Sequence, residues 1–119
     1  MPCDVVLPLL GPRGASYVFG PQKGAKPEDL PILEKSMEHI MRVYLKGIHE
    51  ENYTDEIFNK MANTPGTGAA GGNVAAMISI LGDKAKTVSG MDFVADLTAL
   101  DDKIKRNDFI ITGEGSFDD

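Results

Sequence analysis

The feature that most constrains the fold is the glycine-rich stretch at residues 65–72, which reads Pro-Gly-Thr-Gly-Ala-Ala-Gly-Gly. Glycine tolerates a positive φ and lets another backbone or a ligand come close. The stretch leads directly into Asn73–Leu81, an apolar run that predicts a buried helix. Because the N–H groups and the dipole at the start of a helix attract anions, we expect this turn to hold an anionic group. Packing of a small-residue helix against a sheet is the alternative.

The glycine spacing also has to be compared with known nucleotide motifs. Gly66, Gly68 and Gly71 match G-x-G-x-x-G, and Asp92 follows 21 residues after Gly71, where a dinucleotide-binding fold has an acid. That fingerprint requires a strand immediately before the turn. Residues 56–64 show no alternation and are typical of a helix end followed by a loop. No Gly-Lys-Ser/Thr closes the stretch, so neither nucleotide motif is favoured.

Charge and cysteine content limit the possible partners and the compartment. The 18 acidic and 12 basic residues give a net charge of −6, which argues against nucleic acid or an acidic membrane surface as a partner. Cys3 is the single cysteine, so no internal disulfide forms and a reducing compartment, the cytoplasm, is expected. No apolar run approaches the ~20 residues of a membrane span, so we expect no membrane partner.

The pattern of apolar residues predicts an α/β chain. Residues 3–7, 85–90 and 109–112 are predicted strands, and the last is apolar and β-branched like a strand buried in a parallel sheet. Charged residues at 100–104 predict a turn exposed to solvent. Helices are predicted at residues 15–19, from Pro27 in a first turn to about Ile48, from a Thr54 cap to Met61, at 73–81 with Gly82 as the C-cap, and around 91–97.

Two further places carry candidate functional residues. Lys23 lies in a loop between two glycine-containing breaks, which suits a side chain that points into a cleft, although most loop lysines are simply solvated. Glu114, flanked by Gly113 and Gly115, follows the predicted strand at 109–112, and open α/β sheets bind ligands at the carboxyl ends of their strands. Asp118 lies four residues later, where it can share a crevice with Glu114 or help chelate a divalent ion. A solvated loop is the alternative.

Four separated motifs, taken in order, resemble the bacterial-type glycerate kinase family. They are residues 8–15 (Pro-Leu-Leu-Gly-Pro-Arg-Gly-Ala), 18–25 (Val-Phe-Gly-Pro-Gln-Lys-Gly-Ala), 65–72, and 110–115 with Asp118. The resemblance runs from Cys3 to Asp119 and is weakest at residues 27–63. It implies a glycerate kinase-like α/β fold, a partial three-layer α/β/α arrangement with a mainly parallel or mixed sheet. Residues 1–119 would be one incomplete segment of a two-domain enzyme, with 1–107 beside the cleft and 108–119 in the nucleotide-fold domain.

The resemblance also implies an activity and a set of site residues. Family members transfer the γ-phosphoryl group of ATP to D-glycerate, giving 2-phosphoglycerate, with Mg²⁺. Catalytic roles are implied for Lys23, Glu114 and Asp4, which would neutralise charge, bind Mg²⁺ or accept the hydroxyl proton. Asp118 would bind the metal. Binding of substrate or phosphate is implied for a mostly glycine set: Gly66, Thr67, Gly68, Gly71, Arg13, Gly113 and Gly115.

The chain departs from the family pattern in two ways. Leu7 stands where family members usually have Asn, and leucine cannot make the hydrogen bonds of an amide. Family proteins are also much longer, so we expect this chain to be an internal portion and to be inactive alone, because half of a cleft cannot position reactants. An exposed strand at 109–111 makes a homo-oligomer possible. The alternative is a non-catalytic α/β domain that binds a small anion or a partner chain.

Overall fold

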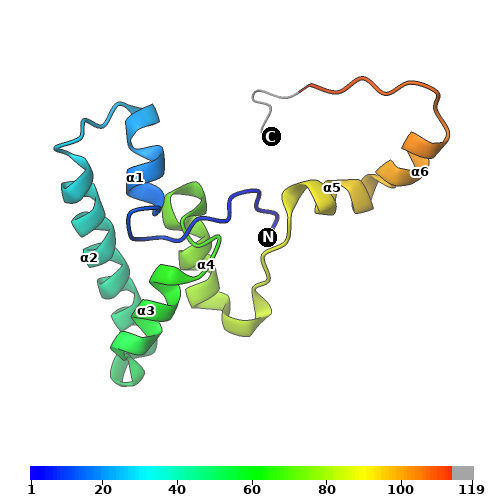
Figure 1. The fold of residues 1–119 in the computed structure, drawn as a ribbon. Helices are drawn as coiled ribbons and strands as arrows, with labels where there is room; N and C mark the ends of the chain where they lie inside the picture. The colour runs from blue at the N-terminus through cyan, green and yellow to red at the C-terminus, as the bar shows by residue number, and fades with distance from the viewer. Residues whose placement is uncertain (114–119) are drawn as a thin grey trace.

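The computed structural model of the chain describes residues 1–113, and these form a succession of helices (Figure 1). The α-helices are α1 (Ala15–Phe19), α2 (Leu30–His49), α3 (Asp55–Asn63), α4 (Asn73–Leu81), α5 (Gly90–Thr98) and α6 (Leu100–Lys105). Short 3₁₀ turns connect them: η1 (Pro21–Lys23), η2 (Glu50–Asn52), η3 (Ala69–Gly72) and η4 (Gly82–Lys84). None of the helices in residues 1–113 has both the length and the apolar character needed to cross a membrane.

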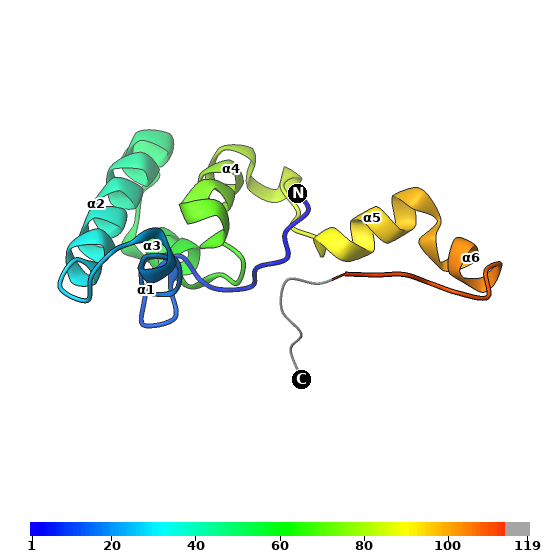
Figure 2. The same ribbon diagram turned by 90° about the horizontal axis from the view of Figure 1, so that it is seen from above.

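The described residues divide into a body and an arm (Figures 1 and 2). The body, residues 1–88, contains α1 to α4. The arm, residues 89–113, contains α5 and α6, which contact each other and no other helix of the described chain. The radius of gyration is 17.7 Å, against about 13.5 Å expected for a compact domain of this length. The arm therefore extends away from the packed part of the chain.

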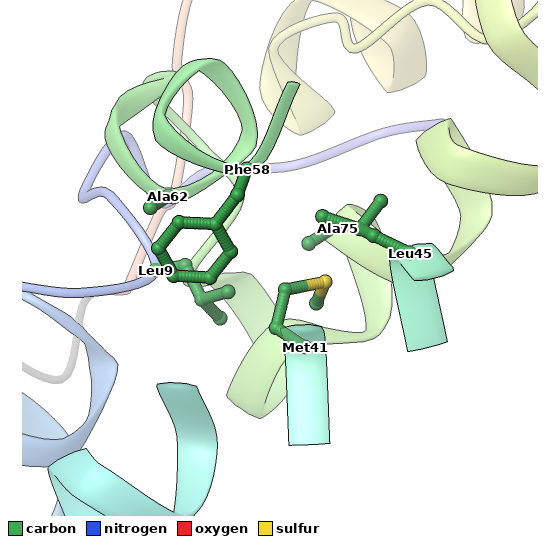
Figure 3. Packing of buried hydrophobic residues seen from close by; sticks show 6 residues of the cluster. All are labelled: Leu9, Met41, Leu45, Phe58, Ala62 and Ala75. Atoms are coloured by element: carbon green, nitrogen blue, oxygen red, sulfur yellow. The ribbon is translucent and has the colours of Figure 1, made fainter. Parts of the chain in front are cut away.

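One hydrophobic cluster holds the body together (Figure 3). Leu9, from the segment before α1, is completely buried at the centre of this cluster and lies beside the ring of Phe58. α2 contributes Met41 and Leu45, α3 contributes Phe58 and Ala62, and α4 contributes Ala75. Burial along α2 is uneven, because Leu45 is fully buried whereas Ile40 is 62% exposed.

Several helix predictions are confirmed by the structure. α1 and α4 have the predicted bounds, and α5 contains the predicted run at 91–97. α3 begins after Thr54, whose hydroxyl accepts a hydrogen bond from the Ile57 N–H at 3.3 Å. Gly82 ends α4 with a φ of +54°. In each case a cap residue or a glycine in the sequence marks the boundary.

Two helix predictions are wrong. α2 begins at Leu30 rather than Pro27, because the carboxylate of Asp29 accepts the Lys26 N–H at 2.9 Å and closes a turn ahead of the helix. Residues 100–104, predicted as a solvated turn, belong to α6. Its first turn carries Asp101 and Asp102 and its last turn carries Lys103 and Lys105, an order that complements the helix dipole.

The predicted sheet is not confirmed in residues 1–113, where no strand forms. An isolated parallel bridge joins Pro2 to Val88, with the Cys3 N–H donating to the Val88 carbonyl at 2.8 Å. Phe109 and Ile111 are 90% and 99% exposed. A strand needs a neighbouring strand to receive its hydrogen bonds, and residues 109–111 have none within the described part of the chain. The mainly parallel or mixed sheet therefore stays a prediction, as does the domain division at 107.

Candidate functional site

The glycine-rich stretch packs directly on the N-terminal segment. The N–H groups of Gly66 and Gly68 both donate to the Leu7 carbonyl, each at 3.1 Å. A Cβ at Gly68 would collide with the Pro8 carbonyl oxygen. Gly66 has a φ of +86°, which a residue with a side chain rarely adopts. Glycine is therefore required at both positions for reasons of packing and backbone conformation.

Most donors of this stretch are already used inside the protein. Besides those of Gly66 and Gly68, the N–H groups of Thr67, Ala69 and Gly71 donate to backbone carbonyls at 3.1–3.2 Å. The Thr67 hydroxyl is fully buried, donates to the Thr64 carbonyl at 2.6 Å and accepts the Leu9 N–H at 3.0 Å. In this conformation these groups are not free for an anion. The predicted ligand-binding role of Gly66, Thr67, Gly68 and Gly71 stays a prediction.

A pocket of about 300 Å³, here called the Lys23 pocket, lies between α1, η1 and α2. Phe19, Leu33, Met37 and Ile40 are the larger apolar residues of its lining. Polar groups come from Lys23, Ser16 and Ser36, and Gly71 of η3 borders the same pocket. An apolar pocket with a few convergent polar groups is typical of a small-molecule site.

A second pocket of about 360 Å³, here called the Asp4 pocket, lies between the N-terminal segment and residues 87–89. It is bordered by Asp4 and Gly66. One oxygen of the Asp4 carboxylate accepts the Met91 N–H at 3.2 Å. A Cβ at Gly90 would lie 2.7 Å from both carboxylate oxygens. Asp4 therefore covers the start of α5 and forms the contact between the body and the arm.

The glycine-rich stretch borders both pockets, so the structure places some of the predicted site residues together. Gly66 lies with Asp4, and Gly71 lies with Lys23. Arg13 is exposed on the turn before α1 and lines neither pocket. Gly113 is exposed at the end of the described residues. Glu114, Gly115 and Asp118 lie outside the described residues.

Two residues near the predicted motifs were not singled out by their sequence pattern. Ser16 lines the Lys23 pocket although it carries no motif of its own. Glu34, in α2, accepts the Gly11 N–H with Oε1 at 2.5 Å. Its other oxygen, Oε2, is buried and has no hydrogen-bond partner within residues 1–113. The Glu34 contact joins residues 23 positions apart, so no local signal in the sequence could have revealed it.

The main ion-pair network lies apart from these pockets. Arg42 pairs with Glu38 at 3.0 Å and with Asp55 at 2.9 Å, and its guanidinium lies 3.7 Å from the centre of the Phe58 ring. The carboxylate of Glu38 raises the pKa of Arg42 above its ordinary value. Because these charges are exposed to solvent, which screens them, the pairs contribute little to stability. The network ties α2 to α3 and has a structural role.

Three carboxylates, Asp4, Glu114 and Asp118, are predicted to act with Mg²⁺, and of these Asp4 lies within the described residues. Within residues 1–113 no three His, Cys, Asp or Glu side chains gather into a group that could hold a metal. Mg²⁺ commonly takes only one or two protein carboxylates and completes its shell with water and substrate phosphates. The chemistry of Asp4 fits one ligand of such a site, with one oxygen shared with the Met91 N–H.

Comparisons with known proteins match this chain over nearly its whole length, and the matches point to the same family. The model of the glycerate kinase family matches residues 1–119. The glycerate kinase of Bacillus cereus is 42% identical over 120 residues, covering 98% of this chain and 28% of its own length. The glycerate 2-kinase of Escherichia coli K12 is 38% identical over 116 residues, with the same coverage of 98% and 28%.

A solved structure shows that the fold is shared as well. A crystal structure described as glycerate kinase 2 from Salmonella typhimurium LT2 matches with a TM-score of 0.64 and 35% identity. The match covers 85% of this chain and 24% of that protein. The chain thus spans little more than a quarter of the length of the curated relatives it matches. It belongs to the glycerate kinase family.

Proposed function

We propose that this chain is the part of a glycerate kinase that supplies one side of the reaction site. In the family-length protein the reaction would be ATP-dependent phosphorylation of D-glycerate to 2-phosphoglycerate, with Mg²⁺, in the cytoplasm. The observation that carries the proposal is the family match over residues 1–119, with relatives named glycerate kinase. The free thiol of Cys3 is compatible with a reducing compartment.

The Lys23 pocket is suited to an anionic group of the reactants. Its lining is largely apolar, and Lys23, an exposed residue of that lining, supplies an ammonium group that attracts a carboxylate or phosphate. Lys23 brings three N–H donors on a flexible stem. We assign to Lys23 the neutralisation of charge at this pocket. Arg13, exposed on the preceding turn, is assigned an electrostatic role at longer range.

The Asp4 pocket is assigned to the metal side of the reaction. When bound, ATP supplies the γ-phosphoryl group and Mg²⁺ neutralises part of its charge. Asp4 would contribute a carboxylate oxygen to the ion, and Glu114 and Asp118 would act as its partners or accept the proton of the glycerate hydroxyl. Gly113 and Gly115 would allow close approach of the phosphate. The glycine-rich stretch would keep the two pockets at a fixed separation, because it borders both.

The isolated chain is proposed to be inactive. Phosphoryl transfer depends mainly on holding the reactants in line and on neutralising charge. Lys23 and Asp4 line separate pockets, and Asp4 also holds the start of the arm. Association of two copies through the exposed apolar residues of the arm is proposed as one way in which a homo-oligomer could form.

The test is D-glycerate-dependent formation of ADP from MgATP, by the 119-residue chain and by a family-length protein that contains it. We expect turnover from the longer protein alone. In that protein Lys23→Ala and Glu114→Gln should lower kcat/KM by at least about tenfold. Lys26→Ala removes an exposed lysine from the same loop region and should leave kcat/KM unchanged.

Three results would contradict the proposal. An absence of glycerate-dependent ADP formation by the longer protein would remove the proposed activity. Turnover by the short chain would show that its cleft is self-contained or rebuilt by dimerisation. Equal effects of Lys23→Ala and Lys26→Ala would show that the charge at the Lys23 pocket has no special role.

A further inference from the structure

Ser16 is the most enclosed polar residue of the Lys23 pocket. It lies in α1, is 8% exposed and lines the pocket together with Lys23 and Gly71. Its hydroxyl forms no hydrogen bond with residues 1–113 and stays accessible to solvent, because Glu34 Oε2 is the one buried side-chain atom of that part of the chain that lacks a partner. A hydroxyl that lines a pocket, reaches solvent and has no protein partner is free to bind water or a ligand as donor and as acceptor.

Ser36 provides a contrast on the opposite wall of the same pocket. Its hydroxyl donates to the Ile32 carbonyl one turn earlier in α2, at 2.8 Å, and its side chain is exposed. Ser36 therefore has its donor satisfied within its own helix. The Ser16 hydroxyl keeps both its donor and its acceptor capacity toward the pocket.

We infer that Ser16 is a ligand-binding residue of the Lys23 pocket, where its hydroxyl donates a hydrogen bond to a carboxylate or phosphate oxygen of the reactant. The same anionic group is neutralised by Lys23, so the pocket offers one charged and one neutral donor in an apolar lining. A hydroxyl donor has a direction that an ammonium ion lacks, so Ser16 would select the orientation of the anion. This inference rests on the proposed glycerate kinase function for the identity of the reactant.

The experiment compares Ser16→Ala with Ser36→Ala in a family-length protein that contains this chain. Each change removes one hydroxyl from the pocket lining, but only the first removes a hydroxyl with free donor capacity. A hydrogen bond to a charged group predicts a rise of about tenfold to hundredfold in KM for D-glycerate in Ser16→Ala. Ser36→Ala, which removes a hydroxyl whose donor is already used within α2, should raise this KM by less than Ser16→Ala does. Ser16→Thr keeps the hydroxyl and should recover most of the affinity if the added methyl group fits.

Calorimetric titrations with D-glycerate and with inorganic phosphate, in the absence of ATP, separate this inference from the proposed activity. If the protein forms no ADP but binds either probe, and binding weakens in Ser16→Ala, the role of Ser16 stands and the activity fails. If ADP forms and Ser16→Ala resembles Ser36→Ala, the activity stands and the role of Ser16 is overturned. A wild-type protein that binds neither probe also overturns it. Tighter binding of glycerate than phosphate identifies a carboxylate site, and the reverse identifies a phosphate site.

Discussion

The body and the arm are both built from helices that carry apolar residues, but a set of these residues is buried in the body, whereas most of those in the arm are exposed. In the body, Leu9 and Leu45 are completely buried and helices α2, α3 and α4 contribute to one cluster. In the arm, residues 89–113, Gly90 is the one residue classed as buried. Leu97 is 75% exposed and Phe109 is 90% exposed.

The comparison shows that an apolar pattern stabilises a helix only when another surface covers it. Short helices such as α5 and α6 are marginal by themselves, and most helical stability in proteins comes from tertiary packing. The Pro2–Val88 bridge fixes the end of the body next to the arm, and the Asp4 carboxylate holds the start of α5 to the body. In a protein of the relatives' length we expect further residues to cover the arm, because large exposed apolar surfaces mark interaction sites.

Truncating a leucine in each region gives the largest expected contrast. Leu45→Ala should lower the free energy of unfolding by about 2–5 kcal/mol, because it opens a cavity in the buried cluster. Leu97→Ala, at a position that is 75% exposed, should change it by less than about 0.5 kcal/mol. Urea denaturation of both variants measures the difference. Equal losses would show that the arm packs on a surface in solution and would remove the distinction between the two regions.

A second test concerns the close approach of Gly68 to the Pro8 carbonyl. Gly68→Ala would push a Cβ into the Pro8 carbonyl and should destabilise the chain by about 1–3 kcal/mol. Gly47→Ala is the matched control, because its Cβ would meet no atom within 4 Å and it lies inside α2. That change should stabilise by about 0.5–1 kcal/mol. Thermal unfolding should therefore show shifts of opposite sign, and a neutral Gly68→Ala would disprove the close approach at Pro8.

The Glu34 contact tests whether a side chain holds the turn that carries Arg13. Glu34→Ala removes the acceptor of the Gly11 N–H, and we expect a loss of about 1–2 kcal/mol. Glu34→Gln keeps an acceptor oxygen and should lose less. The measurement is amide hydrogen exchange at Gly11, which should accelerate in Glu34→Ala. Unchanged exchange at Gly11 would show that this turn is held without Glu34.

The smallest effect is expected where the arm joins the body. Asp4→Ala removes the carboxylate that accepts the Met91 N–H, and loss of such a cap costs about 1 kcal/mol. Hydrogen exchange should accelerate at Met91 and elsewhere in α5, while amides of α2 keep their protection. Ser89→Ala, which removes the other cap of α5, provides a comparison. If protection in α2 falls together with that in α5, the arm and the body unfold as one unit.

Short-range features of the sequence are sufficient to predict the boundaries of several helices and the family of the protein. Gly14 and Gly20 flank α1, Thr54 caps α3 and Gly82 ends α4, so their boundaries depend on residues only a few positions away. The four motifs indicate the glycerate kinase family through the identity and order of their residues, which can be recognised without the tertiary structure. Helix α2 starts later than its sequence predicts because the hydrogen bond between the Lys26 N–H and the Asp29 carboxylate closes a turn ahead of it.

Only the tertiary structure shows whether the N–H groups of the glycine-rich stretch are free for an anion or are bonded within the protein. Its sequence is compatible with an anion cradle and with tight packing, and the choice depends on where its N–H groups find acceptors. The Leu7 carbonyl, far away in the chain, takes two of them, and Thr67 is buried against Leu9. Asp4 likewise meets Met91 across 87 positions. Residues 109–111 have the composition of a strand, but strand hydrogen bonds need a partner, and composition alone does not provide one.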